Sequence, residues 1–199
     1  MTDAEPTDAE PMDAEPMDAE PMDAEPMDAE KKPAATAREI KALAHPLRLR
    51  ILRLCGLHEL TNKQLADRLG QDPGTMLYHV RQLLSTGFLE PAEVRTGESG
   101  ALEKPYRSTG RSWHLDTALR DAGPDGPLAP VEAFREELAE AGPDALASLS
   151  RFVLYLSEAD AEDLITRISA VLSEYTDSDR QRSDRPAYGG IFVLHRSSD

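Results

Sequence analysis

The sequence predicts a mainly α-helical protein that carries a small β-ribbon. Two capping boxes, Thr36–Glu39 and Thr61–Gln64, indicate where helices begin, because the side chains at the ends of each box bond reciprocally to backbone N–H groups. Apolar residues recur every three to four positions after both boxes, which is typical of helices. After Gly87 this spacing stops, and a Gly/Ser-rich stretch at 96–100 separates short apolar segments, which favours a β-ribbon.

Four short helices are expected between residues 36 and 86. His45-Pro46 ends the first and opens the second, because proline disfavours helical geometry at the preceding residue and suits the first helical position. Gly70 ends the third helix, and Asp72-Pro73 supplies an N-cap and a first-turn proline for the fourth. The expected helices span residues 36–44, 46–57, 61–69 and 73–86.

The third and fourth helices, joined by a tight glycine-containing turn, match a helix-turn-helix. The ribbon that follows is then a wing, in which we expect Phe88, Trp113 and Leu115 to pack over the helices. Its strands are expected at 88–90, 94–95, 106–109 and 112–115. The predicted fold is therefore a winged helix-turn-helix followed by a helical C-terminal region with a short terminal strand.

The C-terminal region follows a linker at 117–130, where three prolines and two glycines fall between Gly123 and Pro130. Helices are expected at 130–141, 143–156 and from Ser157 onward, and a short strand at 187–195. The third helix carries an apolar stripe that either forms a dimer seam or packs within the chain: Leu164, Ile168, Val171, Leu172 and Tyr175. The predicted division is a tail (1–35), a winged helix-turn-helix (36–116), the linker (117–130) and a helical dimerisation and possible effector region (131–199).

Charge is distributed unevenly along the chain. Residues 1–30 hold six Asp and six Glu without a Lys or Arg, so they carry −12 of the net charge of −15. Residues 37–115 hold 12 Lys/Arg against 8 Asp/Glu, whereas residues 116–199 hold 8 against 17. A mildly basic module followed by an acidic one is expected if only the first meets phosphates.

The tail repeats Asp-Ala-Glu-Pro-Met/Thr, and we expect it to be disordered because proline interrupts helices and the like charges repel. One interpretation is an acidic arm that occupies the basic DNA-binding face or discourages non-specific binding. The other is a low-complexity expansion without a specific role.

The fourth helix is the candidate DNA reader, because a helix that enters the major groove must present groups that contact base edges. With Met76, Val80 and Leu83 facing inward, the outward side chains include Thr75, Leu77, Tyr78, Arg81 and Gln82. Leu77 cannot form a hydrogen bond, so it packs on a thymine methyl group or extends the core. The candidate phosphate contacts are Thr61, Lys63, Arg95, Lys104, Arg107 and Arg111.

Four segments, in order and at matching spacing, resemble the ArsR family of winged-helix repressors: residues 44–52 (AHPLRLRIL), 65–70 (LADRLG), 75–84 (TMLYHVRQLL) and 86–89 (TGFL). The resemblance covers about two-fifths of the chain. It implies a bacterial homodimer on a near-palindromic operator, with residues 73–86 as the reading helix. It places Thr75, Leu77, Tyr78 and Arg81 toward DNA; the family commonly has Ser at the position of Leu77, so a base hydrogen bond is not expected there.

Other functions are less well supported by the residues present. Cys55 is the one cysteine and the five histidines form no close pair, so we expect no metal site and no cofactor. No catalytic motif occurs, so an enzyme is not expected. The alternative that stays open is a winged-helix protein-interaction module without specific DNA binding. A lone cysteine, an acidic start and the absence of a long apolar run predict a cytoplasmic protein without a membrane partner, and an unknown small-molecule effector stays possible.

Overall fold

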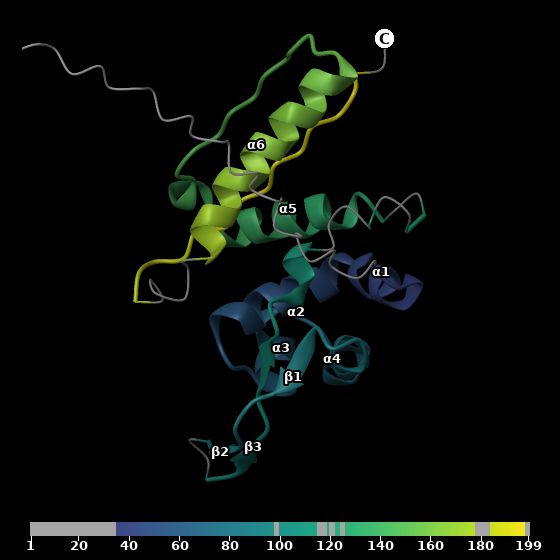
Figure 1. The fold of residues 1–199 in the computed structure, drawn as a ribbon. Helices are drawn as coiled ribbons and strands as arrows, with labels where there is room; N and C mark the ends of the chain where they lie inside the picture. Colours follow the sequence, from purple (N-terminus) through teal and green to yellow (C-terminus); the bar gives the residue numbers. More distant parts are fainter. Residues whose placement is uncertain are drawn as a thin grey trace, which may run out of the picture. The chain divides into compact units, whose positions relative to one another are not determined.

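The computed structural model describes residues 35–97, 100–114, 119, 122–123, 126–177 and 184–197 (Figure 1). The chain divides into two units, residues 1–34 and 35–199. The predicted acidic tail therefore lies outside the described residues except for Ala35. Leu115 and the side chain of Trp113 also lie outside them, so their predicted packing over the ribbon is not described.

The four predicted N-terminal helices are all present. They are α1 (Ala37–Leu43), α2 (Pro46–Leu57), α3 (Asn62–Arg68) and α4 (Pro73–Ser85). Both capping boxes form as expected: the Thr36 and Thr61 hydroxyls accept from the amides of Glu39 and Gln64, whose side chains accept the amides of the threonines. Local sequence thus determines where these helices begin.

A small antiparallel ribbon follows α4. Strand β1 (Leu89–Pro91) pairs with β4 (Tyr106–Ser108), with Glu90 opposite Arg107, and β2 (Arg95–Thr96) pairs with β3 (Leu102–Glu103). Leu60 bonds to Tyr106 in both directions, which joins the ribbon to the segment between α2 and α3. The expected strand at 112–115 is wrong over its described residues: 111–114 form a 3-10 helix, η1 (Arg111–His114), after Gly110 turns the chain at a positive φ.

The core lies inside the helix-turn-helix. Ile51, Leu65, Met76, Val80 and Phe88 have no exposed surface, and each comes from a position predicted to face inward or to close the ribbon. Leu119, which falls within the region expected to be a linker, is also buried in this core. The mainly helical fold with a wing is therefore confirmed.

Helix α5 (Ala129–Ala141) confirms the first predicted C-terminal helix and packs against α2. Ala129 and Ala133 are buried, and small side chains allow two helices to approach closely. Acidic residues of α5 meet arginines of α2: Arg50 bonds to Glu136 at 2.6 Å and also to Glu140, and Arg53 bonds to Glu137 at 2.9 Å. These ion pairs therefore help to hold α5 against α2.

The rest of the C-terminal region differs from expectation in two places. Instead of a helix over 143–156, a single 3-10 turn, η3 (Pro143–Ala145), is followed by an irregular segment up to Ser157. The expected terminal strand over 187–195 is not formed either, because no strand pairs with it among the described residues. The third predicted helix is present as α6 (Glu158–Asp177).

Candidate nucleic-acid interface

The turn between α3 and α4 fixes the start of the candidate reading helix. Gly70 adopts a φ of 61°, which other residues rarely tolerate, and so lets the chain reverse after α3. The Asp72 carboxylate then accepts the amides of Gly74 and Thr75 at 2.8 and 3.1 Å. Asn62 Nδ2 donates to the carbonyl of Pro73 at 2.9 Å, which joins the first turns of the two helices. The N-terminal turn of α4 is thus held by hydrogen bonds to Asp72, which precedes it, and to Asn62 of α3.

Helix α4 has one buried and one exposed face. Met76, Val80 and Leu83 are completely buried, as predicted from their spacing. Thr75, Tyr78 and Arg81 are exposed, whereas Leu77 and Gln82 are half-buried. Thr75, Tyr78 and Gln82 are three and four positions apart, so their side chains share one stripe of the helix. The α4 surface therefore presents a hydroxyl, a phenol, a guanidinium and an amide to solvent.

His79, on the buried side of α4, packs against His45 and lies near Arg48. The rings of His79 and His45 lie 4.6 Å apart, and His79 Nδ1 is buried without a hydrogen-bond partner among the described residues. Burial, together with the neighbouring His45 and Arg48, lowers the pKa of His79 to about 4. Arg48 is buried as well and donates to the carbonyls of Ala42 and Lys41 at the end of α1. The neutral His79 thus packs α4 on the junction of α1 and α2.

The first turn of α3 supplies two candidate phosphate contacts with different surroundings. Thr61 is half-buried, and its hydroxyl is engaged in the capping box. Lys63 is exposed and makes no ion pair with another described residue. Of the two, Lys63 has the side chain that is free to reach an external anion.

The candidate basic residues of the ribbon are mostly paired. Arg95 Nε lies 3.2 Å from the Glu103 carboxylate across β2 and β3, and Arg95 also donates to the carbonyl of Glu59. Arg107 Nε lies 2.7 Å from Glu90, its cross-strand neighbour, and this bond raises the pKa of Arg107. Lys104 is exposed and has no carboxylate partner in the part of the chain that the structure describes. These ion pairs are exposed, so they are worth little free energy and can exchange for phosphate.

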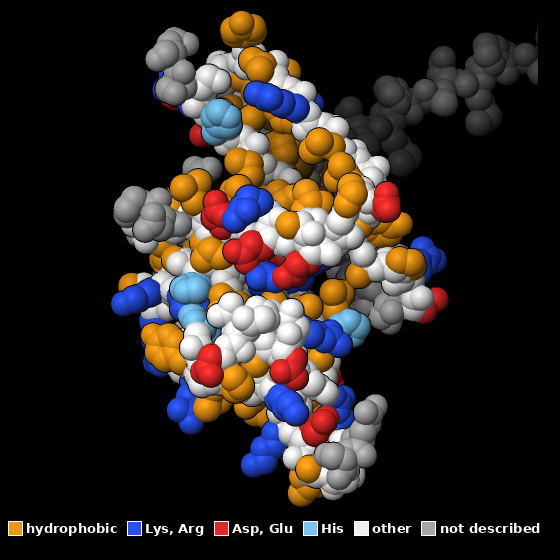
Figure 2. All heavy atoms as spheres, turned by 180° about the vertical axis from the view of Figure 1, so that it is seen from behind, with side chains coloured by type: hydrophobic (Ala, Val, Ile, Leu, Met, Phe, Trp, Pro, Cys, Tyr) orange, Lys and Arg blue, Asp and Glu red, His pale blue; other side chains and the backbone are white. Residues whose placement is uncertain are grey.

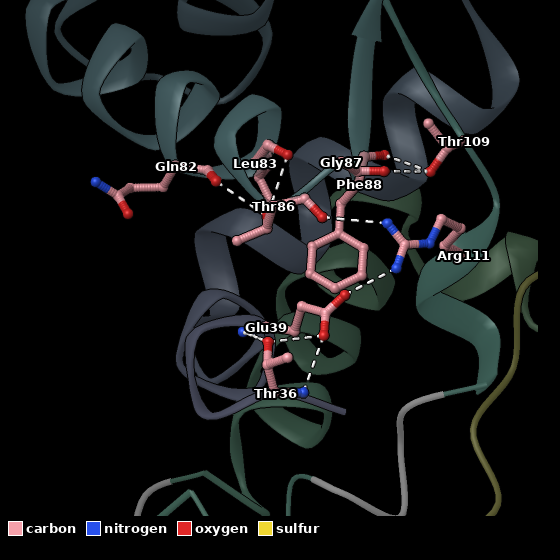
Figure 3. A network of polar contacts seen from close by, with 9 residues as sticks. All are labelled: Thr36, Glu39, Gln82, Leu83, Thr86, Gly87, Phe88, Thr109 and Arg111. Carbon is pink, nitrogen blue, oxygen red and sulfur yellow. Dashed lines mark hydrogen bonds and ion pairs between the residues drawn. The ribbon is translucent and has the colours of Figure 1, made fainter. Parts of the chain in front are cut away.

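Arg111 has a structural environment that sequence reasoning did not anticipate (Figure 3). Its guanidinium donates to the Glu39 carboxylate at 2.8 Å and to the carbonyl of Thr86 at 3.3 Å, and it lies over the Phe88 ring. In the same network the Thr109 hydroxyl donates to the carbonyl of Gly87 at 2.8 Å. Arg111 therefore joins α1, the end of α4 and the end of the ribbon. The Gln82 side chain points away from this network (Figure 3).

Sequence reasoning also missed Asn62 and Glu39 as positioning residues. Nothing in the local pattern distinguishes Asn62 from an ordinary first-turn residue, because its partner lies eleven positions along the chain. Glu39 was expected only to complete a capping box, which it does while also binding Arg111. The Thr36 bonds, and to a lesser extent Arg111, lower the pKa of Glu39 despite its desolvation, so this carboxylate is ionised at neutral pH.

Residues 43–92 match the profile of a family described as a helix-turn-helix domain. The matched part is about a quarter of the chain, and it begins at the end of α1 and ends after β1. This part of the chain is a helix-turn-helix domain of the ArsR-like kind, which confirms the resemblance seen in the residues. Such domains define a class of DNA-binding transcriptional regulators, and the match supports that class for this chain. No curated protein matches the sequence.

None of the described helices has the length and apolar character needed to cross a membrane. No group of three or more His, Cys, Asp or Glu side chains in the described ranges is arranged to hold a metal ion.

Proposed function

We propose that the chain is a sequence-specific duplex-DNA-binding regulator that acts as a repressor and binds its operator as a homodimer. Helix α4 enters the major groove, and the wing at 94–107 contacts the adjacent backbone. The observation that carries the proposal is the division of α4 into a buried face of Met76, Val80 and Leu83 and an exposed face of hydrogen-bonding side chains.

Base recognition falls to the exposed face of α4. Arg81 is the one described side chain of this face that can donate two parallel bonds to a guanine edge, which is the commonest specific contact in the major groove. Thr75, Tyr78 and Gln82 supply single donors or acceptors. Leu77, half-buried between the two faces, contacts a thymine methyl group or only the core.

Phosphate contacts divide into two groups by the surroundings of the side chains. Lys63 and Lys104 are exposed without carboxylate partners among the described residues, so binding phosphate breaks no existing bond. Arg95 and Arg107 must first leave Glu103 and Glu90, which reduces their net contribution. Arg111 is held by Glu39 and Thr86 and acts on DNA binding by positioning the helix rather than by contact.

Selection of binding sites from a pool of random duplexes tests the proposal. We expect an enriched site with two-fold symmetry for the wild-type chain and loss of preference at one base position per half-site for Arg81→Ala. Arg135→Ala is the matched control, because it removes an exposed arginine from α5, where it pairs only with Glu132. The Arg135→Ala variant should select the same binding site as the wild-type chain. A pool without enrichment would favour the protein-interaction module instead.

A further inference from the structure

Two extended segments, residues 146–157 and 186–197, flank α6 without forming a strand (Figure 1). Within the described ranges, residues 147–156 and 186–197 make no backbone hydrogen bond to another strand. Both segments are rich in apolar residues: Phe152-Val-Leu-Tyr-Leu156 in the first and Ile191-Phe-Val-Leu194 in the second. An extended apolar segment with unpaired N–H and C=O groups is a template for pairing with another chain.

The exposure of the side chains alternates in both segments, so that every second side chain is less exposed than its neighbours. Val153 and Tyr155 are 76% and 100% exposed, whereas Phe152 and Leu154 between them are 48% and 52% exposed. In the second segment Ile191 and Val193 are exposed, and Phe192 and Leu194 are half-buried. A period of two is the periodicity of β-strands. The side chains of both segments therefore alternate as in a β-strand, but neither segment pairs with a strand among the described residues.

The uncovered apolar surface is large enough for a stable interface. Helix α6 adds the exposed Val171 and Leu172 to the two segments, and apolar side chains gather at the end of the molecule that holds α6 (Figure 2). The exposed apolar residues of 146–193 together leave on the order of 1,000 Å² uncovered, whereas a stable interface buries about 800 Å² per partner. Soluble monomers rarely expose apolar patches larger than a few hundred Å², so we expect another molecule to cover part of this surface.

The acidic tail is a poor match for this surface. Residues 1–34 contain no Val, Ile, Leu, Phe, Tyr or Trp, and they hold 12 of the chain's 37 Asp and Glu residues; methionine is their one large apolar residue type. Covering an apolar face with this segment would bury the carboxylates that separate its methionines, which costs free energy. A second molecule with an apolar surface therefore fits this face better than the tail does.

We propose that this occupant is a second copy of the chain. The inference deepens the proposed function, in which the chain acts as a homodimer, and names the surface that makes it one. Each copy offers the same unpaired strand edges and the same apolar helix face, which is what a self-complementary two-fold interface requires. Residues 150–156 and 190–195 pair across the interface as β-strands, and α6 of each copy covers one face of the resulting sheet. This two-layer arrangement buries the apolar side chains and satisfies the backbone groups together.

Sedimentation equilibrium of the full chain without DNA tests the proposal. We expect the wild-type chain to sediment with the mass of two chains at micromolar concentration. Tyr155→Asp places a charge at the centre of the interface and should raise the dimer dissociation constant roughly tenfold or more. Because Tyr155 is completely exposed in the single chain, this substitution removes no contact within it. Leu102→Asp is the control, because Leu102 is an exposed apolar residue of the wing, and it should leave the dimer unchanged.

Hydrogen exchange of the wild-type chain provides the second measurement, which does not depend on any variant folding. Slow exchange of the amides of 150–156 and 190–195 supports strand pairing, and exchange at the rate of a free chain overturns it. A wild-type mass of one chain, or a Tyr155→Asp dimer as stable as the control, also overturns the proposal. The dimer is measured without DNA, so a chain that sediments as a monomer yet binds an operator duplex contradicts this inference and leaves DNA binding standing. A dimer that binds no duplex supports this inference and contradicts the proposed DNA-binding function.

Discussion

The guanidinium of Arg111 lies 2.8 Å from the carboxylate of Glu39, which joins the end of the wing to the first turn of α1 (Figure 3). The same guanidinium donates to the carbonyl of Thr86, at the end of the candidate reading helix. Arg111 therefore links the end of α4 to α1 through a partner that lies 72 positions away in the sequence. Arg111 is also a predicted phosphate contact, and these bonds lead us to propose that it positions α4 instead.

Removing the Arg111 guanidinium should reduce stability more than it reduces the electrostatic part of DNA binding. We expect Arg111→Ala to lower the free energy of unfolding by about 1–2 kcal/mol, because it loses an ion pair and a carbonyl contact. Chemical denaturation measures this loss, and Glu39→Gln should reproduce part of it. A phosphate contact would instead reduce the slope of log affinity on log salt by about one, so a reduced slope with unchanged stability would contradict the positioning role.

The burial of His79 should make the domain less stable in mild acid. Its pKa is lowered from 6.5 to about 4, so the unfolded state binds the proton more readily than the folded state between these pH values. Stability is therefore fully present above about pH 6.5 and is lost as the pH falls through the folded pKa, by up to about 3 kcal/mol from this group. Urea denaturation at pH 7 and pH 4 measures the loss. His79→Leu should show a smaller pH dependence, and an unchanged dependence would show that His79 does not cause it.

The ion pairs between α2 and α5 should fix the C-terminal region on the helix-turn-helix. Arg50 is buried and bonds to Glu136 and Glu140, whose side chains are partly exposed. Arg50→Ala should therefore cost about 1–3 kcal/mol of stability and open the α5 segment to protease. Limited proteolysis with mass analysis locates the cleavage. Arg135→Ala removes an exposed arginine of α5 itself and should leave the pattern unchanged; equal cleavage of both variants would count against the role of Arg50.

Cys55 should be unreactive toward thiol reagents in the folded chain. It is buried in the core, and burial raises the pKa of its thiol to about 12. Since the thiolate is the reactive form, alkylation at neutral pH should proceed only as fast as the domain unfolds. The rate of iodoacetamide labelling, followed by mass spectrometry with and without urea, tests this. Rapid labelling of the native chain would place Cys55 outside the core.

The parts of the fold that could be predicted from sequence depend on local signals. The capping boxes at Thr36 and Thr61 and the turn around Gly70 and Asp72 involve bonds between residues at most five positions apart, so the local sequence contains these partners. The buried face of α4 follows from one helical period for the same reason. The strand expected at 112–115 was wrong because the chain turns at Gly110, and a glycine alone does not show in which direction.

The C-terminal region could not be predicted as well, because its apolar residues fit two periods. Leu146, Leu149 and Val153 match a helix, whereas Phe152 to Leu156 form a continuous apolar run that also suits a strand, and only the structure shows the extended form. The ion pairs of Arg95, Arg107 and Arg111 depend on tertiary contacts. Charge counting could identify these arginines as candidates for phosphate contact but could not show that each already has a carboxylate partner.

Fluorescence anisotropy is the most direct test of whether α4 of the full chain reads duplex DNA. The chain is titrated against a labelled duplex that contains the selected site and against a scrambled duplex, each at low and at physiological salt. We expect tighter binding to the selected site, a steep fall in affinity with salt, and loss of the preference in Arg81→Ala. Equal affinity for both duplexes together with a flat salt dependence would contradict it.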